Sequence, residues 1–162
     1  MLRRNHGFSL VELTLTIVIL SVIAVVVLPK FFNQATFNER FFYDDLLAAS
    51  RYASKLAIGS GCSVQLAVGA GGYSLAQDSN CDFTSPNFSI TVNRPDDGTP
   101  YANSDVPSTV TITASQPMLV FRPNHQVVTS AGASLSTATI QLSGELVRLI
   151  TIYGDSAYVA GT

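Results

Sequence analysis

The first stretch of the chain is apolar on every helical face. From Phe8 to Leu28 the side chains are apolar or weakly polar, with the single exception of the carboxylate of Glu12. These 21 residues, as a helix rising about 1.5 Å per residue, would span roughly 30 Å, the thickness of a bilayer core. The pattern predicts a transmembrane helix over residues 8–28. Glu12 then needs an explanation, because an ionised carboxylate in hydrocarbon is costly.

Beyond Leu28 the pattern becomes amphipathic. Apolar and small residues recur at spacings of three and four, at Phe31, Ala35, Phe42, Leu46, Ala49, Ala53 and Leu56. This spacing predicts that the helix continues over residues 29–58 and packs one face on a globular head, before Gly59 and Gly61 end it. Pro29 lies at the junction of the two helical parts and has no N–H to donate to the carbonyl of Val25. We therefore predict a helix kink at Pro29.

After Gly61 the apolar positions alternate. The segments CSVQLAV and YSLAQ, joined by GAGG, predict a β-hairpin. Further strands are predicted at Phe88–Val92, Thr109–Thr113, Met118–Arg122, Gln126–Thr129, Ala138–Leu142, Leu146–Tyr153 and Ala157–Ala160. One long N-terminal helix followed only by strands predicts an α+β fold, with the helix packed on an antiparallel β-sheet head.

Charge is sparse and unevenly placed. Charged residues make up 12% of the chain, and the net charge is −2. Apart from the adjacent Arg3 and Arg4, the basic residues are scattered singly, so we expect no nucleic-acid binding. Arg3 and Arg4 precede the apolar run and favour a cytoplasmic N-terminus with the head outside. The run ends in VVVLPKFF, which lacks the small-residue cleavage site of a secretory signal peptide, although a plain signal anchor remains an alternative.

Two cysteines, Cys62 and Cys81, bracket the predicted hairpin. In an exported protein such a pair readily forms a disulfide. If Gly69 faces Gly72, Cys62 faces Ser79, so a diagonal or bulge-assisted bond to Cys81 is geometrically plausible. A metal site is the alternative, but two cysteines without nearby histidines fall short of the usual four ligands.

Little in the chain points to catalysis. His125 is the only histidine beyond the first seven residues, and neither a phosphate-binding loop nor a metal-ligand cluster appears, so we expect a protein that is not an enzyme and has no cofactor. The segment RPDDGTPYANSD offers oxygens to calcium from Asp96, Asp97, Asn103 and Asp105. The spacing of an EF-hand is absent, so a solvated turn is the favoured interpretation.

The stretch NHGFSLVEL accounts for Glu12. It places a Gly at position 7, a Phe at position 8 and a Glu at the fifth position counted from that Phe, followed by an unbroken apolar run. This arrangement resembles the N-terminal signal of type IV pilins and type II secretion pseudopilins. The resemblance implies that prepilin peptidase cuts between Gly7 and Phe8 and methylates the new amine of Phe8. It also implies that Glu12 pairs with the terminal amine of a neighbouring subunit. The alternative is that Glu12 only reaches toward the lipid headgroups.

A finer resemblance concerns the start of the head. The stretch FFYDDLLAASRYASKLAIGSGCSVQL is similar to the helix-to-strand region of GspH/FimT-type minor pilins, and the placing of Cys62 and Cys81 is most similar to the MshC-type minor pilin of the MSHA pilus. In FRPNHQVV the glycine usual in these proteins is replaced by Asn124 or His125. No cysteine follows Cys81, which favours a minor over a major pilin.

The resemblance implies the organisation of the whole chain. Residues 1–7 would be the leader peptide, 8–28 the transmembrane and assembly helix, 29–58 the amphipathic helix and 59–162 a periplasmic head. The chain would cross the inner membrane once, with prepilin peptidase, the assembly platform and other pilin subunits as partners. The expected function is that of a minor pilin. A minor pseudopilin of a type II secretion system, or a tip adhesin or receptor, are the alternatives.

Overall fold

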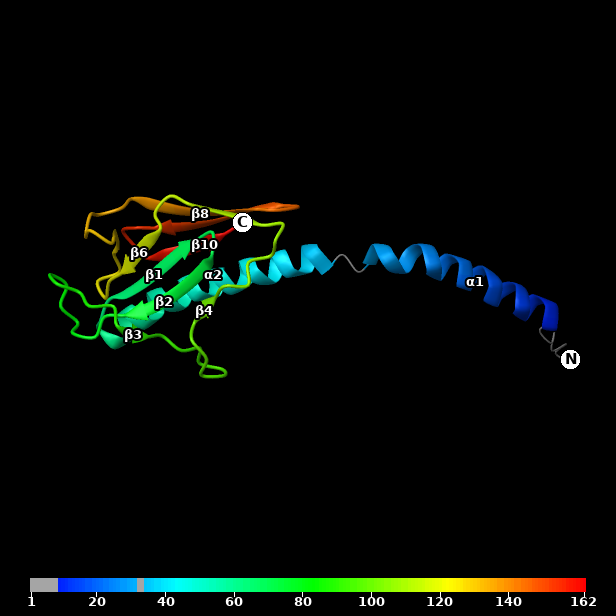
Figure 1. The fold of residues 1–162 in the computed structure, drawn as a ribbon, viewed down its shortest axis with the longest axis horizontal. Coiled ribbons are helices and arrows are strands. Elements are labelled where there is room, and N and C mark those ends of the chain that lie inside the picture. Colours follow the sequence, from blue (N-terminus) through cyan, green and yellow to red (C-terminus); the bar gives the residue numbers. More distant parts are fainter. Residues whose placement is uncertain (1–8, 32–33) are drawn as a thin grey trace, which may run out of the picture. The chain divides into compact units, whose positions relative to one another are not determined.

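The computed structural model describes residues 9–31 and 34–162, with side chains for 9–24 and 34–162. The chain forms two compact units, residues 1–34 and 35–162, which are described separately. The first contains α1, Leu10–Phe31 (Figure 1). All its described side chains, from Ser9 to Ala24, are exposed.

The predicted continuous helix is described as two helices. α1 is followed by α2, Gln34–Ser60, and residues 32 and 33 between them lie outside the described part. The backbone of α1 is helical at Pro29 and continues to Phe31, so the kink stays a prediction. In the part of the chain that the structure describes, no helix has both the length and the apolar character of a membrane span.

The head consists of α2 and two antiparallel sheets. The first sheet has the order β3-β2-β1-β6-β7, and β4 also pairs with β2. Its strands are β1 Val64–Gly69, β2 Gly72–Gln77, β3 Ile90–Thr91, β4 Ala102–Asn103, β6 Met118–Phe121 and β7 Val127–Thr129. The second sheet has the order β10-β9-β8-β5. Its strands are β5 Thr111–Ala114, β8 Thr137–Ser143, β9 Val147–Tyr153 and β10 Tyr158–Gly161. The predicted α+β fold, with a long helix packed on antiparallel strands, is confirmed, and the strands are divided between two sheets.

The predicted β1–β2 hairpin forms, with the register that the sequence analysis considered for it. Gly69 faces Gly72, and the pairing runs back to Val64 opposite Gln77. Gly72 has a φ of 108°, which favours glycine, and a β-carbon there would lie 1.9 Å from the carbonyl oxygen of Asn103. The close approach of β4 to the hairpin therefore depends on a glycine at position 72.

One hydrophobic core joins α2 to both sheets. The helix contributes Phe42 and Leu46, together with alanines at positions 49, 53 and 57 that are completely buried. Small side chains let the helix axis lie close to the strands. The inner faces of the sheets supply the other large core residues, among them Leu66, Leu119, Phe121, Ile140, Ile150 and Ile152. From residue 34 onward, where side chains are described, the predicted amphipathic face of residues 29–58 therefore packs on the head.

Backbone hydrogen bonds connect the two sheets at Gly154. Its carbonyl accepts the N–H of Val127 at 2.7 Å, and its N–H donates to the carbonyl of Ser136 at 2.8 Å. A β-carbon at position 154 would lie 1.7 Å from the carbonyl oxygen of Leu135. The turn after β9 can therefore approach β7 and the segment before β8 only because residue 154 is glycine.

Candidate functional site

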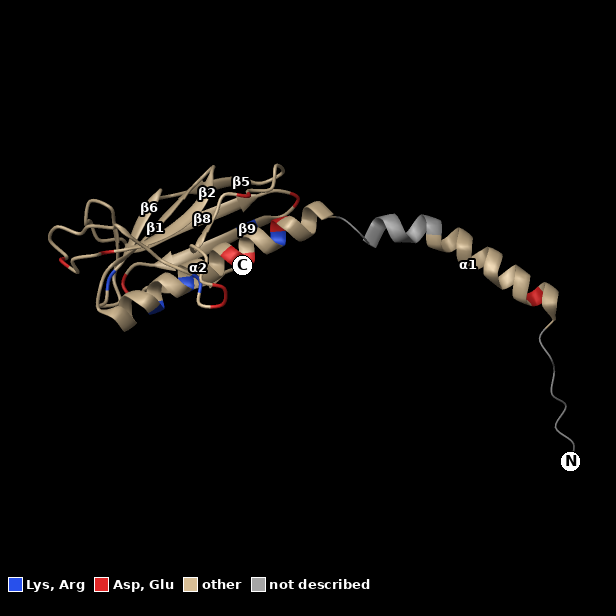
Figure 2. Ribbon diagram, turned by 60° about the horizontal axis from the view of Figure 1, so that its bottom comes forward, with Lys and Arg blue, Asp and Glu red and all other residues tan. Residues whose placement is uncertain are grey.

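Among the residues of α1 whose side chains are described, 10–24, Glu12 is the one that carries a charge, and Figure 2 shows few charges on this helix. It lies in the first turn of the helix, where the partial positive charge of the helix N-terminus favours a carboxylate, and its side chain is exposed. The hydroxyls of Thr14 and Ser21 donate to helix carbonyls three residues earlier, at 2.9 and 2.7 Å. These hydroxyls are satisfied within the helix, whereas the exposed carboxylate of Glu12 is available to a group from outside.

The group expected to pair with Glu12 is the amine that cleavage would create on Phe8. Gly7 and Phe8 lie outside the described residues. Cleavage between them, methylation of Phe8 and pairing of its amine with Glu12 therefore stay predictions.

Cys62 and Cys81 form a disulfide with a Cα–Cα distance of 4.6 Å. The segment that follows β2 is also held by Asp78, whose side chain is 1% exposed. Its Oδ1 accepts the N–H of Asn87 at 2.8 Å and that of Asn80 at 3.3 Å. The loop of residues 79–89 is thus fixed near its start by the disulfide and near both ends by the buried carboxylate.

A second acid, Asp45, is partly buried on the face of α2 that packs against the first sheet, and its side chain is 9% exposed. Its carboxylate accepts two hydrogen bonds from Arg94, at 2.7 and 2.9 Å. The hydroxyl of Tyr73 donates to it at 2.5 Å and the amide of Asn103 at 3.1 Å. The guanidinium of Arg94 also lies 4.5 Å from the centre of the Tyr101 ring. This Asp45 cluster joins α2 to β2, to β4 and to the segment between β3 and β4.

The Asp45 cluster changes the proton affinities of its members. Burial alone would raise the pKa of Asp45, but the hydrogen bonds from Arg94, Tyr73 and Asn103 outweigh burial and hold that pKa below its usual value. Burial, and then the hydrogen bond to Asp45, raise the pKa of Tyr73. The cluster therefore consists of an ionised Asp45 between a charged arginine and a neutral tyrosine at neutral pH, as expected of a structural contact.

Another buried acid, Glu39, lies six residues before Asp45 on α2 and connects the helix to the second sheet. Its carboxylate accepts the hydroxyl of Thr109 at 2.5 Å and the N–H of Glu145 at 3.0 Å. The hydroxyl of Thr36 donates to the carboxylate of Glu145. A β-carbon at Gly144 would lie 2.5 Å from the Glu39 carboxylate. Glu39 thus holds the β8–β9 turn on α2, and Gly144 leaves room for it.

Two of the four calcium candidates, Asn103 and Asp97, use their side chains in other contacts. The amide nitrogen of Asn103 donates to Asp45, and its Oδ1 accepts the N–H of Asp105 at 2.9 Å. The Oδ1 of Asp97 accepts the N–H and the hydroxyl of Thr99, at 2.9 and 2.7 Å. Among the described residues, no three acidic, histidine or cysteine side chains are grouped to hold a metal ion. The contacts favour the interpretation as turns, and calcium binding by Asp96, Asp97, Asn103 and Asp105 has no structural support.

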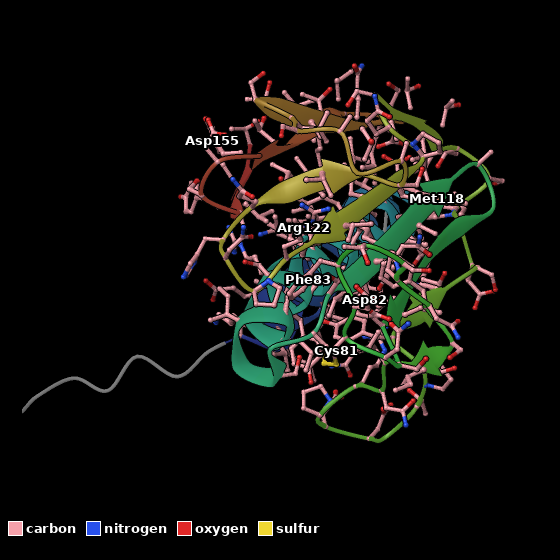
Figure 3. All side chains as sticks on the ribbon, turned by 90° about the vertical axis from the view of Figure 1, so that its left-hand side faces the viewer. Cys81, Asp82, Phe83, Met118, Arg122 and Asp155 are labelled. Carbon is pink, nitrogen blue, oxygen red and sulfur yellow. A yellow bond between two sulfur atoms is a disulfide. The ribbon has the colours of Figure 1, made fainter. Side chains whose placement is uncertain are left out.

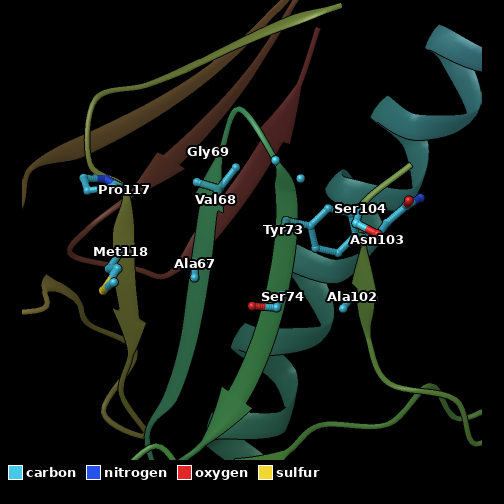
Figure 4. A pocket seen from close by; sticks show the side chains of 12 residues that line it. Ala67, Val68, Gly69, Tyr73, Ser74, Ala102, Asn103, Ser104, Pro117 and Met118 are labelled. Atoms are coloured by element: carbon cyan, nitrogen blue, oxygen red, sulfur yellow. The ribbon is translucent and has the colours of Figure 1, made fainter. Parts of the chain in front are cut away.

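A shallow cavity of about 520 Å³ crosses the turn of the β1–β2 hairpin (Figure 4). Small or uncharged residues line it, among them Ala67, Ser74, Ala102 and Met118. Tyr73 and Asn103 also line it, but both polar groups are bonded to Asp45. The described lining offers no ionisable group for acid–base chemistry at neutral pH.

The sequence analysis did not single out the buried acids Glu39 and Asp78 or the partly buried Asp45. Glu39 lies three positions before Phe42, and Asp45 lies three positions after it, so both belong to the buried stripe of α2. That spacing is a signal that an acid on the helix is buried and needs partners. Arg94, the partner of Asp45, carries no comparable signal.

The comparisons with known proteins agree with the predicted family. A family model described as the prokaryotic N-terminal methylation motif matches residues 2–28. A crystal structure of the type IV minor pilin FimU of Pseudomonas aeruginosa PAO1 matches with a TM-score of 0.50 and 15% identity, covering 76% of this chain and 91% of that chain. A second crystal form of FimU gives a TM-score of 0.49 and 15% identity over 75% and 85% of the two chains. No curated protein matches the chain.

The fold is therefore that of a pilin, with a long N-terminal helix and an antiparallel β-rich head. Together with the methylation motif, this fold supports the type IV pilin family to which NHGFSLVEL is similar. The pilin fold family is structural rather than enzymatic, in agreement with the expectation that the chain is not an enzyme.

Proposed function

We propose that the chain is a minor pilin, a structural and assembly subunit of a type IV pilus. The observation that carries the proposal is the combination of two features in one chain. The methylation motif occupies residues 2–28, and the remainder has a head whose fold is similar to that of a type IV minor pilin. Either feature alone would be less specific, because the motif is short and the identity to FimU is 15%.

The proposal assigns a step to each part of the N-terminus. Prepilin peptidase cuts between Gly7 and Phe8 and methylates the amine of Phe8. The helix over residues 8–28 anchors the subunit in the inner membrane, with the N-terminus cytoplasmic and the head periplasmic. This agrees with a helix whose described side chains are exposed and mostly apolar, since such a surface requires an apolar environment.

Glu12 has a defined role in this scheme. Cleavage creates a positive charge on Phe8 in an apolar surrounding, where an unpaired charge is costly. The exposed carboxylate of Glu12 on an incoming or neighbouring subunit neutralises that charge. The pair can form only after cleavage, so processing and assembly are coupled.

Mass spectrometry of the chain from its native membrane tests the processing. The expected result is a mature N-terminus at Phe8 carrying one methyl group. A Gly7→Val variant should keep its leader. A wild-type chain that begins at Met1, or at any residue other than Phe8, would contradict the proposal.

Incorporation into fibres tests the pairing. Glu12→Ala should strongly reduce the amount of subunit in purified pili while its amount in the membrane stays normal. Thr14→Ala is the matched control, because Thr14 lies on the same helix and bonds only within it. Normal incorporation of the Glu12→Ala chain would show that Glu12 only reaches the headgroups.

The MSHA-type pilus is the proposed machine, since the Cys62–Cys81 bond spans the first hairpin as the MshC-type resemblance implies. A deletion strain separates the alternatives. Loss of pili supports an assembly subunit, and loss of protein secretion with normal pili supports a pseudopilin. Normal pili without adhesion support a tip adhesin or receptor.

A further inference from the structure

Three arginines follow α2 in the chain, and two of them are held on the helix. Arg94 pairs with Asp45, and the guanidinium of Arg148 lies 5.2 Å from the centre of the Tyr43 ring. The third, Arg122, directly follows β6. Its side chain makes no hydrogen bond or ion pair with the residues that the structure describes. Arg122 is partly buried, so its guanidinium has lost some of its hydrogen bonds to water. A ligand with hydrogen-bond acceptors could replace them.

Arg122 lies between two neighbouring cavities at the end of the head that carries the disulfide loop (Figure 3). The volumes are about 140 and 220 Å³. Arg122 and Phe83 line both. The first also includes Ser130, with Pro86 as an apolar wall, and the second includes Pro123. The two cavities therefore share one cation and one aromatic ring.

The loop geometry holds Phe83 at this place. The disulfide of Cys81 and the buried Asp78 fix the segment on either side, and Asp82 accepts the N–H and the hydroxyl of Thr84 at 2.9 and 2.7 Å. Phe83 is nevertheless 48% exposed. A large aromatic side chain that is fixed but half uncovered beside a free guanidinium provides both an apolar and an ionic contact.

We propose that the Arg122–Phe83 site binds a carboxylate on a peptide segment of a protein partner. The guanidinium offers two parallel N–H donors that match a carboxylate, and Ser130 adds a hydroxyl. Phe83 and Pro86 cover the apolar part of the residue that bears it. Arg122 is the only basic residue lining the two cavities, and Asp82 lies next to Phe83. The one positive charge of Arg122, with Asp82 nearby, suits a ligand that carries a single negative charge. It disfavours a nucleic-acid backbone, which carries many.

Small probes test the chemistry with the full chain in detergent micelles. N-acetyl-phenylalanine presents a terminal carboxylate beside an aromatic ring, and its primary amide is the uncharged control. A glutamate blocked at both ends presents a side-chain carboxylate, with blocked glutamine as control. Each is titrated while the Nε–H signal of Arg122 and the amide signals of Phe83 and Ser130 are followed by NMR.

We expect saturable shifts with at least one carboxylate probe and none with the amides. The probe that binds more tightly shows whether the partner's carboxylate is that of a chain terminus or of an acidic side chain. Arg122→Gln should weaken binding about tenfold or more, because a charge-assisted pair is lost. Arg40→Gln removes an equal charge from an exposed position on α2 and should leave binding unchanged.

Two results would overturn the inference. One is equal shifts with carboxylate and amide probes, and the other is undiminished binding by an Arg122→Gln chain whose melting temperature is normal. If Arg122→Gln fails to fold, Phe83→Ala is used instead and should also weaken binding. The readout lies in the head and does not depend on processing at Phe8, so failure here leaves the proposed minor pilin function intact.

Discussion

Arg94 holds Asp45 with two parallel hydrogen bonds, 2.7 and 2.9 Å long, across 49 positions of the chain. The side chain of Asp45 is 9% exposed and that of Arg94 is 21% exposed, so the pair is largely removed from water. Tyr73 and Asn103 complete the ring of donors. The pair is bidentate and charged at both ends, which makes it a strong link between α2 and the segment that joins β3 to β4.

Asp45→Ala is expected to destabilise the head by about 3 kcal/mol, because Arg94 would keep its burial and lose its partner. The control is Asp44→Ala, since Asp44 is exposed and its contact with Arg40 is 3.7 Å long. That change should cost less than about 0.5 kcal/mol. Denaturant unfolding of both variants measures the difference, and equal losses would mean that the Asp45 cluster contributes little.

The same cluster predicts how stability depends on pH. The pKa of Asp45 is lower in the folded chain than its ordinary value of about 3.9 in an unfolded one. Ionised Asp45 therefore stabilises the fold above about pH 4, and this contribution is lost as the pH falls through the lowered pKa.

The wild-type melting temperature should fall more steeply between about pH 4 and pH 2 than that of Asp45→Asn. Other acids with lowered pKa values, such as Asp97, titrate in both chains and cancel in the comparison. Parallel curves would contradict the assignment.

The sequence pattern was sufficient to predict strands in which apolar and polar residues alternate over several positions. β8 was predicted as Ala138–Leu142 and is observed as Thr137–Ser143, because its inward residues form an unbroken alternation. β4 was missed, since two residues carry no period and its strand exists only by pairing with β2. The division into two sheets was also missed, because it depends on pairings between strands far apart in sequence, such as β1 with β6 and β5 with β8.

The functional candidates also fall into those that the sequence predicts and those that only the fold brings together. Glu12 was identified because its distance from Phe8 is fixed along the chain. The pair of Asp45 with Arg94 and the cavities beside Arg122 depend on segments far apart in sequence. Tertiary packing brings them together, so no local pattern predicts them.

Glu39→Ala should release the β8–β9 turn from α2. It removes the acceptor of two hydrogen bonds and leaves the N–H of Glu145 without that partner, at a cost of about 2 kcal/mol. Hydrogen exchange should accelerate at the amide of Glu145 more than in the β1–β2 hairpin. Arg40→Ala, at the next position but exposed, is the control. Unchanged exchange at Glu145 would show that the turn does not need Glu39.

Replacing Cys62 and Cys81 together by alanine should destabilise the head by about 3 kcal/mol, the value expected for a closed loop of about 20 residues. The loss should concentrate in residues 79–89, because β1 and β2 keep their own pairing. Wild-type chain melted with and without a reductant should show the same decrease. Ser85→Ala in the same loop is the control, and a wild-type chain insensitive to reductant would contradict the prediction.

His125→Gly should stabilise the head by about 1 kcal/mol. His125 is exposed and has a φ of 64°, in the left-handed region where residues other than glycine are strained. Its N–H donates to the carbonyl of Arg122 at 3.2 Å, a contact that glycine retains. The structure thus indicates that His125, rather than Asn124, is the position of this turn whose backbone favours glycine.

Asn124→Gly distinguishes the two positions. Asn124 has no positive φ, and its side chain bonds both the amide oxygen and the N–H of Gln126, at 2.7 and 3.3 Å. Glycine there should lower the melting temperature because it loses these contacts and adds freedom to the unfolded chain. Opposite shifts for the two variants identify the glycine position of the turn. A gain from Asn124→Gly with a loss from His125→Gly would assign it to residue 124 instead.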